Sequence, residues 1–298
     1  VLNNDIKEII FFGGEPLLNF RVLKFFIEQL SHKIRLGFTT NGIALKEDIA
    51  QFLAEHIEVG IQISIDADME FRTKKYNNII MENVKGFIKK RHKYGGHVEA
   101  NTVVSEKDYE NYANFFYTYL TKEIGFDLVN TNLRGEVVKE LGKEIEGWLL
   151  KGYRPPSCAF DGFIRAHYEN NTKIGGCFYC KACSKEITIA CDGTIYACYQ
   201  FHNFNMFKIG HIESGIDKKK RREWFLLQKQ RLSECRQCKH FKLCLGACPY
   251  YHYIEKNELG VNGEENCSTR KLHFDIGKRI YENVVTKGTE FNLSFLRS

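Results

Sequence analysis

The chain has 298 residues, 43% of them apolar and 13% aromatic, and a net charge of +6. This composition excludes an intrinsically disordered chain, and no apolar run reaches the roughly 18 residues of a membrane span. The first residues lack the basic and apolar regions of a signal peptide, so we expect a cytoplasmic protein in which disulfides are rare. All 11 cysteines lie from Cys158 to Cys267, and this clustering predicts metal or cluster ligation.

Strand-like and helix-like patterns alternate through the first half of the chain. Short apolar runs predict strands at residues 6–12, 34–39, 59–65, 98–104 and 126–131. Helical periodicity predicts a helix capped by Asn19 with the apolar face Val22, Phe25, Phe26 and Leu30, and further helices at 46–57, 80–88 and 107–123. Because helical crossovers join parallel strands, the pattern predicts an α/β fold with a helix-covered parallel sheet.

Such a sheet is either doubly wound or part of a β/α barrel, and in both folds ligands bind at the carboxyl ends of the strands. The segments at that edge are residues 13–16 (GGEP), 39–42 (TTNG), 64–66 (SID) and 132–135. We therefore expect the ligand-binding residues of the first half among these segments.

The second half of the chain has a less regular sequence pattern than the first, and it contains all the cysteines. Residues 136–176 are less regular, and Pro155-Pro156 suggests a connection between domains. Residues 187–190 and 194–199 predict a β-hairpin around an Asp192-Gly193 turn. In that hairpin Cys198 would lie opposite Ile187, which brings Cys183 close to Cys198.

A dense cysteine run follows the hairpin. Cys235, Cys238, Cys244 and Cys248 stand in the spacing C-x2-C-x5-C-x3-C, so short loops would let their thiolates converge on one centre. Four thiolates suit either zinc or an iron–sulfur cluster, and spacing alone does not choose between the two.

The full cysteine pattern carries a family resemblance. Cys183-x9-Gly193-x4-Cys198, the run from Cys235 to Cys248, and Cys267 together resemble the seven-cysteine pattern of the SPASM domain, as do the local sequences CDGTIYAC, KIGHI and CLGACP. SPASM domains follow the barrel of radical S-adenosylmethionine (radical SAM) peptide-modifying enzymes, and Cys177 stands where members with two auxiliary [4Fe–4S] clusters carry an extra cysteine. The resemblance implies two ligand sets, the first of Cys177, Cys183, Cys198 and Cys248 and the second of Cys235, Cys238, Cys244 and Cys267.

Three cysteines remain outside these sets. Cys191 shares a strand face with Ile187 and Ile189, so we expect a small buried hydrophobic side chain. Cys180 could replace Cys177 or Cys183 as a ligand. Cys158 belongs to no motif.

The first half resembles the radical SAM barrel from its second strand onward. FFGGEPLL resembles the GGEP motif, which lies against the methionine amino group of S-adenosylmethionine, and TTNG and SIDAD resemble the segments after the next two strands. Glu15 and exposed carbonyls could accept from that ammonium group, and the glycines allow close approach. The resemblance implies a cofactor site of Gly13, Gly14, Glu15, Pro16, Asn41, Ser64 and Asp66.

One part of the radical SAM pattern is absent from the printed sequence. The family carries a CxxxCxxC loop ahead of GGEP, whose three cysteines bind the cluster that cleaves S-adenosylmethionine, and here no cysteine precedes Cys158. We therefore expect a chain that lacks its first βα unit, with that cluster present only in a complete chain. The expected domains are a partial barrel at 1–150, a connection at 151–176, a SPASM domain with a β-hairpin and short helices at 177–275, and a C-terminal helix and tail at 276–298.

The resemblance implies an enzyme, a maturase that abstracts hydrogen from a peptide or protein through a 5′-deoxyadenosyl radical. Its cofactors would be S-adenosylmethionine and two auxiliary clusters, and its electron donor a flavodoxin or ferredoxin. A maturase that crosslinks ribosomal peptides is preferred over an anaerobic sulfatase-maturating enzyme. In the latter enzymes an aspartate that acts as a base follows the third cysteine of the first set. Here that position is Tyr199, which is either a candidate base or a buried packing residue.

Two other classes of function remain as alternatives. A zinc-stabilised binding module on an α/β scaffold would explain the cysteine run but not GGEP, TTNG and SID on successive strand ends. Nucleic-acid binding through the basic run at residues 218–222 ranks last, because no stacking aromatic series accompanies that run and a solvated helix surface explains it.

Overall fold

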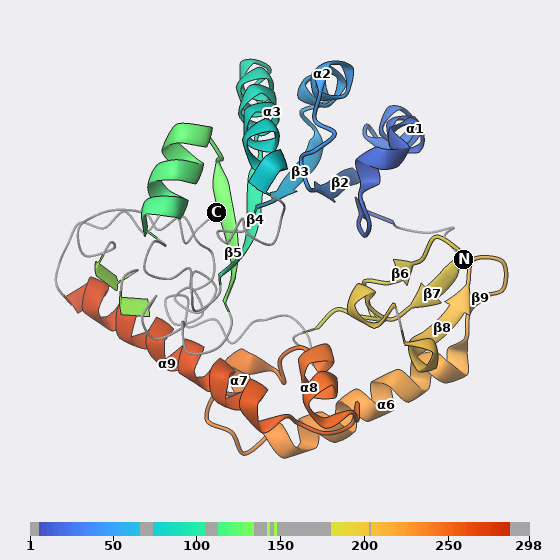
Figure 1. Ribbon diagram of the computed structural model, residues 1–298. Helices are drawn as coiled ribbons and strands as arrows, with labels where there is room; N and C mark the ends of the chain where they lie inside the picture. The colour runs from blue at the N-terminus through green and yellow to red at the C-terminus, as the bar shows by residue number, and fades with distance from the viewer. Residues whose placement is uncertain are drawn as a thin grey trace. The chain divides into compact units, whose positions relative to one another are not determined.

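The computed structural model describes residues 6–65, 74–104, 113–133, 142–143, 146–147, 180–202 and 204–286. The chain forms two compact units (Figure 1). One unit comprises Asn4–Gly162 and Arg279–Ser298, and we call it the sheet unit. The other comprises Val1–Asn3 and Phe163–Lys278, and we call it the cysteine-rich unit.

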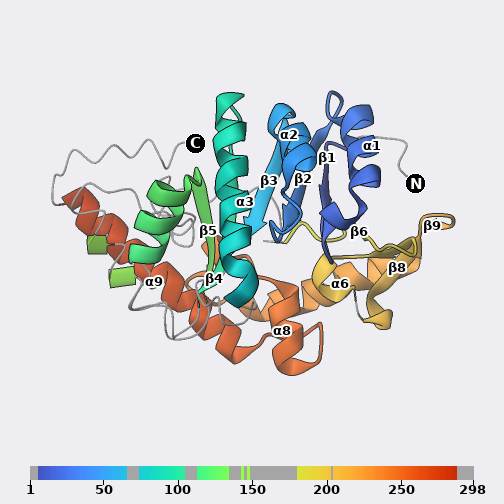
Figure 2. The ribbon, with the colours of Figure 1, turned by 45° about the horizontal axis from the view of Figure 1, so that its top comes forward.

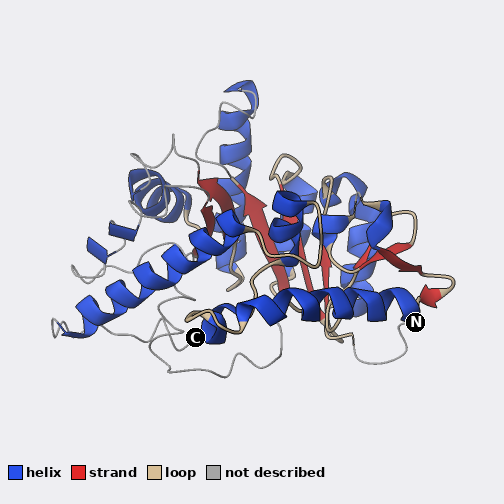
Figure 3. Ribbon diagram, turned by 90° about the horizontal axis from the view of Figure 1, so that it is seen from below, coloured by secondary structure: helices blue, strands red, loops and turns tan. Residues whose placement is uncertain are grey.

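The sheet unit contains five parallel strands in the order β1-β2-β3-β4-β5. The strands are β1 (Glu8–Phe11), β2 (Arg35–Thr40), β3 (Val59–Ser64), β4 (Glu99–Val104) and β5 (Leu128–Leu133). They lie side by side, in red in Figure 3. Sequential neighbours pair throughout, so the predicted parallel sheet is confirmed.

Helices connect these strands. They are α1 (Phe20–Leu30), preceded by the 3-10 turn η1 (Pro16–Asn19), then α2 (Glu47–Glu55), α3 (Lys74–Lys93) and the π-helix η3 (Ala113–Ile124). Figure 2 shows α1, α2 and α3 side by side along one face of the sheet. Ile27, Leu53 and Val84, one from each helix, are fully buried, so this face carries the core of the unit.

The first helix differs from the prediction in its cap and in its buried face. Asn19 occupies the N-cap position, but its side chain makes no capping hydrogen bond. Leu23 and Ile27 are the buried residues, whereas Val22 is 42% and Phe25 60% exposed. Phe26 and Leu30 of the predicted face are half-buried, so the prediction is right for these two residues and wrong for Val22 and Phe25.

The cysteine-rich unit combines a small antiparallel sheet with four helices in the described residues. The strands are β6 (Thr188–Ile189), β7 (Thr194–Tyr196), β8 (Lys208–His211) and β9 (Gly215–Ile216), with the 3-10 turns η4 (Tyr199–Phe201) and η5 (Asn205–Phe207). The helices are α6 (Lys218–Cys235), α7 (Phe241–Cys244), α8 (Pro249–Lys256) and α9 (Glu264–Thr286), of which the part up to Lys278 belongs to this unit. Phe201 packs edge-on against Trp224 and Tyr253 at the centre of its core.

The predicted hairpin forms, but in a shifted register. Thr188 pairs with Tyr196 and Ile189 with Ile195, so the register places Ala197, not Cys198, opposite Ile187. The reason is the turn, in which the Gly193 amide donates to the Ala190 carbonyl and Gly193 itself has a φ of +84°. The loop is therefore one residue longer than an Asp-Gly turn of two residues.

The same turn corrects the expectation for Cys191. This residue lies in the turn and is exposed, so it is not a small buried hydrophobic side chain on a strand face. By contrast, the Cys183 amide donates to the Ala197 carbonyl at 3.2 Å, which places Cys183 beside the end of β7 as predicted.

The basic run forms the exposed start of α6. The Asp217 carboxylate caps this helix by accepting from the Lys219 and Lys220 amides. The structure therefore places the run on a helix surface. None of the helices in the described part of the chain is long and apolar enough to cross a membrane.

One buried arginine on α3, Arg91, links several segments of the sheet unit. The Arg91 side chain is 1% exposed and donates to five backbone carbonyls, those of Leu53, His56, Ile57, Val59 and His97. Burial lowers its pKa to about 10, and the charges of Glu58 and Asp127 act in the opposite direction. Arg91 therefore joins the end of α2 to the starts of β3 and β4.

We expect Arg91→Met to lower the free energy of unfolding by about 3–5 kcal/mol, because it leaves several buried carbonyls without a donor. Chemical denaturation followed by circular dichroism measures this loss. Lys89→Gln, on the exposed side of the same helix, is the control and should change stability by less than about 0.5 kcal/mol. A loss as small as that of the control would contradict the role assigned to Arg91.

Candidate functional site

The carboxyl ends of β1, β2 and β3 bring three of the predicted segments to one edge of the sheet. Gly13, Gly14, Glu15 and Pro16 follow β1, Asn41 follows β2, and Ser64 ends β3. Adjacent parallel strands end at the same edge, so these segments are neighbours. Asp66 lies outside the described residues.

Glu15 joins the first two segments. Its Oε1 accepts from the Leu17 amide at 3.1 Å and from the Thr40 hydroxyl at 2.7 Å, and its Oε2 accepts from the Asn41 amide at 2.7 Å. The structure therefore shows this carboxylate fixing the loop after β1 to the end of β2. Sequence reasoning gave Glu15 a role toward a ligand and missed Thr40, although the threonine pair before Asn41 was a signal for it.

Two glycines at this edge have left-handed backbone conformations, one beside open space and one against a buried side chain. Gly13 has a φ of +93°, and a Cβ there would meet no atom within 4 Å, so the space beside it is open. Gly42 has a φ of +80°, and a Cβ there would lie 2.8 Å from Val84 Cγ2, which makes glycine necessary. Between them the Asn41 side chain accepts from the Ile43 amide at 2.9 Å and fixes the loop after β2.

We expect Glu15→Gln to loosen this edge. The amide that replaces one carboxylate oxygen would face a donor, so the unfolding free energy should fall by about 1–3 kcal/mol and amide hydrogen exchange at Asn41 should accelerate. Glu28→Gln on α1 is the control, because Glu28 forms an exposed ion pair with Lys24 at 3.7 Å, and such pairs contribute little to stability. Unchanged exchange at Asn41 in Glu15→Gln would contradict this arrangement.

The second cysteine set comes from four places in the cysteine-rich unit. Cys235 ends α6, Cys238 lies in the turn that follows, Cys244 ends α7 and Cys267 lies in the first turn of α9. All four are half-buried. Burial raises the pKa of Cys235 and of Cys267, and negative charge on Cys244 raises both further. The Cys235 thiol donates to Asn262 Oδ1 at 3.6 Å, five residues before Cys267 in the chain, so the end of α6 lies next to the segment that leads to Cys267.

The first set is described only in part, because Cys177 lies outside the described residues. Burial raises the pKa of Cys198 to about 11, with charge on Cys248 and Cys180 contributing in the same direction. Cys180, Cys183 and Cys198 also belong to one packed cluster. Cys180 therefore lies close to the residues of the first set. The alternative in which Cys180 replaces Cys177 or Cys183 as a ligand stays open. Cys158 also lies outside the described residues.

The loop between Cys244 and Cys248 has a strained backbone. Leu245, Gly246 and Ala247 have successive φ values of +46°, +85° and +53°. Left-handed conformations cost a residue with a side chain about 1 kcal/mol or more, and such strain persists where neighbouring structure imposes it. Here Cys244 ends one helix and Cys248 begins the next, so the loop fixes the directions of two cysteines from different sets.

A buried histidine supports that loop. The His252 ring accepts from the Gly263 amide through Nδ1 at 2.8 Å, so Nε2 carries the proton that it shares with the Gly246 carbonyl at 3.1 Å. The ring is 1% exposed. Burial lowers its pKa to about 4, and the positive charge of Arg231 acts in the same direction. His252 therefore ties the strained loop to the residues that precede Cys267.

This histidine predicts a pH dependence of stability. The unfolded chain binds a proton near the ordinary value of 6.5 and the folded one only near 4, so the stabilisation is complete above pH 6.5 and falls as pH drops toward 4. The loss amounts to about 3 kcal/mol at about 1.36 kcal/mol per pKa unit. Denaturation curves between pH 7 and 4 measure it.

His252→Asn should be less stable throughout but should lose this fall, which separates His252 from other titrating groups. The exposed His32→Gln is the control and should keep the slope of the unaltered protein. Equal slopes for the unaltered protein and His252→Asn would contradict the prediction.

Tyr199 is half-exposed at the start of η4 and is therefore not the buried packing residue of the alternative interpretation. Burial of its hydroxyl raises its pKa above the ordinary value, and charge on Cys198 adds to the shift. A tyrosine with a raised pKa stays protonated at neutral pH. It can donate a hydrogen bond there, but the shift works against a role as base.

The residues present fit an iron–sulfur cluster by their chemistry. Their side chains are thiols, the group that iron–sulfur clusters require, and the buried Arg231 shares the Asn262 oxygen with the Cys235 thiol. Among the described residues no three His, Cys, Asp or Glu side chains form a group that could hold a metal ion. Sequence reasoning missed Arg231, although it stands four residues before Cys235 and thus on the same face of α6.

This chain is similar to known proteins in sequence and in fold. Residues 1–114 match the family model described as "Radical SAM superfamily". The chain is 25% identical over 215 residues to the "Radical SAM cyclopropyl synthase TigE" of Paramaledivibacter caminithermalis, a match of 66% of this chain and 44% of the relative. It is 26% identical over 289 residues to the "Cysteine-type anaerobic sulfatase-maturating enzyme" of Clostridium perfringens, a match of 83% of this chain and 76% of the relative. The chain thus spans less than half of the first relative and about three quarters of the second.

Solved structures share the fold. "Native anSMEcpe with bound AdoMet" has a TM-score of 0.71 and 22% identity and covers 95% of this chain and 85% of its own. "Crystal structure of Streptococcus suis SuiB bound to precursor peptide SuiA" has a TM-score of 0.64 and 18% identity, covering 87% of this chain and 65% of its own. Residues 1–114 are thus similar to the radical SAM superfamily, and the predicted α/β fold with a parallel sheet is confirmed.

Proposed function

We propose that this chain belongs to a maturase that modifies a ribosomally made peptide or protein and that its cysteine-rich unit is a SPASM domain holding two auxiliary [4Fe–4S] clusters. The observation that carries the proposal is that a chain whose residues 1–114 match the radical SAM superfamily continues into a unit in which Cys235, Cys244 and Cys267 stand on three helices, α6, α7 and α9. When bound, a radical SAM cluster supplies an electron that cleaves S-adenosylmethionine to a radical able to abstract hydrogen.

The chain's own residues would bind and position the reactants. Gly13, Gly14 and Pro16 would present backbone to the methionine end of S-adenosylmethionine, while Glu15 holds their loop against Asn41. Ser64 and Asp66 would complete that site. In the other unit two ligand sets, Cys177, Cys183, Cys198 and Cys248, and Cys235, Cys238, Cys244 and Cys267, would hold the clusters.

The substrate class follows from the relatives and from Tyr199. One relative is named a cyclopropyl synthase, and one solved structure holds a precursor peptide. These names support a peptide in which a new bond is formed. An electron donor of the flavodoxin or ferredoxin type and a cytoplasmic location complete the proposal.

Sulfatase maturation is the second candidate function. It is supported by the coverage of the Clostridium perfringens relative, 83% of this chain. Against it stands Tyr199, where we expect such enzymes to carry an aspartate base. Burial raises the pKa of this tyrosine, which disfavours it as a replacement for that base.

We expect the protein, reconstituted anaerobically with iron and sulfide, to be brown and to bind about eight iron atoms, four for each auxiliary cluster. Cys235→Ala and Cys267→Ala should each lose about four of them, because each removes one ligand of the second set. Cys191→Ala is the matched control and should lose none, since Cys191 is exposed in a turn. Iron and sulfide analysis with absorbance spectra measures the outcome.

A colourless protein that holds zinc after anaerobic preparation would overturn the proposal in favour of the binding module.

The same preparation also tests whether these residues alone cleave S-adenosylmethionine. No cysteine precedes Cys158, so we expect these 298 residues alone to form no 5′-deoxyadenosine from S-adenosylmethionine. Turnover by them would contradict the assignment of cleavage to a CxxxCxxC loop.

A further inference from the structure

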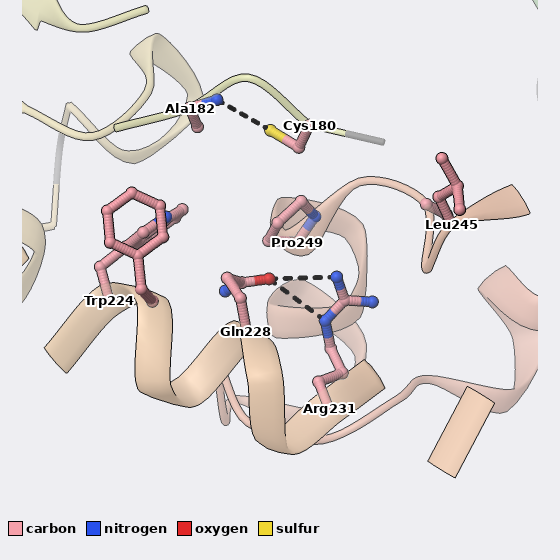
Figure 4. A pocket seen from close by; sticks show the side chains of 9 residues that line it. Cys180, Ala182, Trp224, Gln228, Arg231, Leu245 and Pro249 are labelled. Carbon is pink, nitrogen blue, oxygen red and sulfur yellow. Dashed lines mark hydrogen bonds between the residues drawn. The ribbon is translucent and has the colours of Figure 1, made fainter. Parts of the chain in front are cut away.

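Arg231 lies deep in the cysteine-rich unit, on α6. Its side chain is 1% exposed. Nε and Nη2 donate to the Gln228 side-chain oxygen at 3.3 and 3.0 Å, as Figure 4 shows, and Nη1 donates to the Asn262 side chain at 3.2 Å. Nη1 also donates to the Gly246 carbonyl. The guanidinium therefore contacts α6, the strained loop between Cys244 and Cys248, and the segment before Cys267.

All of these acceptors are neutral. Within the part of the chain that the structure describes, no carboxylate pairs with Arg231. Burying a charge without an opposite charge costs several kcal/mol, and neutral oxygens offset only part of that cost. Thiols lie near it instead, because the Asn262 Oδ1 that accepts from Arg231 also accepts from the Cys235 thiol at 3.6 Å, and Gly246 is two residues from both Cys244 and Cys248. These thiols are the groups that could supply the opposite charge. A thiol supplies that charge only as a thiolate, the form in which cysteine binds a cluster.

The reach of this charge includes both cysteine sets. In the second set, the Cys235 thiol donates to the same Asn262 oxygen that accepts from Arg231. In the first set, Cys248 stands at the start of α8, two residues after Gly246, whose carbonyl accepts from Arg231. Cys180 and Arg231 also line one small pocket of about 10 Å³, where Figure 4 shows Cys180 across from Gln228 and Arg231.

We propose that Arg231 is a positioning residue whose single permanent charge, buried within reach of both cysteine sets, raises the reduction potentials of both auxiliary clusters. The inference rests on the proposed function, because it requires those clusters. A cluster that takes up one electron gains one negative charge, and a nearby buried cation stabilises that product more than the oxidised form. Removing or cancelling the charge should therefore make both clusters harder to reduce.

Gln228 offers a way to cancel the charge without touching Arg231. Its Oε1 accepts both bonds from the guanidinium, whereas its Nε2 is buried and has no hydrogen-bond partner among the described residues. Gln228→Glu therefore keeps every hydrogen bond and places a carboxylate against the guanidinium. The arginine would keep that carboxylate ionised.

The experiment is a dithionite titration of the anaerobically reconstituted protein, followed by electron paramagnetic resonance. It compares Gln228→Glu, Arg231→Gln and Arg231→Lys with the unaltered protein, and iron content is measured first. Arg236→Gln is the matched control, because this exposed arginine follows Cys235 directly and solvent screens its charge. We expect Gln228→Glu and Arg231→Gln to shift both midpoint potentials to more negative values, and Arg231→Lys and Arg236→Gln to leave them in place.

The outcomes separate the inference from the proposed function. Fewer than about eight iron atoms in the unaltered protein contradicts the two clusters themselves. Full iron in Gln228→Glu with unchanged midpoints, or with only one midpoint shifted, overturns the role of Arg231. Loss of iron by Gln228→Glu overturns it as well, since the charge would then be needed to load the clusters rather than to set their potentials. If Arg231→Gln does not load, Gln228→Glu and Arg231→Lys decide.

Discussion

The cost of burying a guanidinium constrains both units of this protein. Arg91 and Arg231 are each 1% exposed, and neither has a carboxylate partner within hydrogen-bond distance among the described residues. Arg91 donates to five backbone carbonyls, which together offset the cost of its burial without any group outside the polypeptide. In the described part of the chain Arg231 has only three oxygen acceptors, those of Gln228, Gly246 and Asn262, and the last of these also accepts from the Cys235 thiol. A nearby negative charge would therefore stabilise Arg231 more than Arg91, whose acceptors are complete within the backbone.

At the edge of the sheet a charged side chain, Glu15, forms hydrogen bonds that fix the backbone. Glu15 uses both carboxylate oxygens to accept from donors of the chain itself, those of Leu17, Thr40 and Asn41. A residue of a ligand-binding motif can thus act by holding the loop that binds. This explains why the open space lies beside Gly13, on the backbone, rather than beside a free carboxylate.

The sequence predicted the larger elements of this fold well because its signals were redundant. Alternating strands and helices required a parallel sheet, and the carboxyl ends of its strands located GGEP and TTNG at one edge. Prediction failed where one residue of offset matters. A longer turn moved Cys191 to the surface and Cys198 out of the expected pair, and an apolar surplus on α1 hid Leu23 and Ile27 as the buried pair. Arg231 and His252 were missed because their roles depend on tertiary neighbours.

The positions of Arg231 and His252 show why the loop between Cys244 and Cys248 tolerates its strain. Both side chains donate to the same carbonyl, that of Gly246, at the centre of three left-handed residues. A relaxed backbone would turn that carbonyl away and leave two buried donors unpaired, which costs more than about 1 kcal/mol per strained residue. The loop is thus held by donors from α6 and α8. Because Cys244 and Cys248 are assigned to different sets in the proposed function, a displacement of this carbonyl would move a proposed ligand of each.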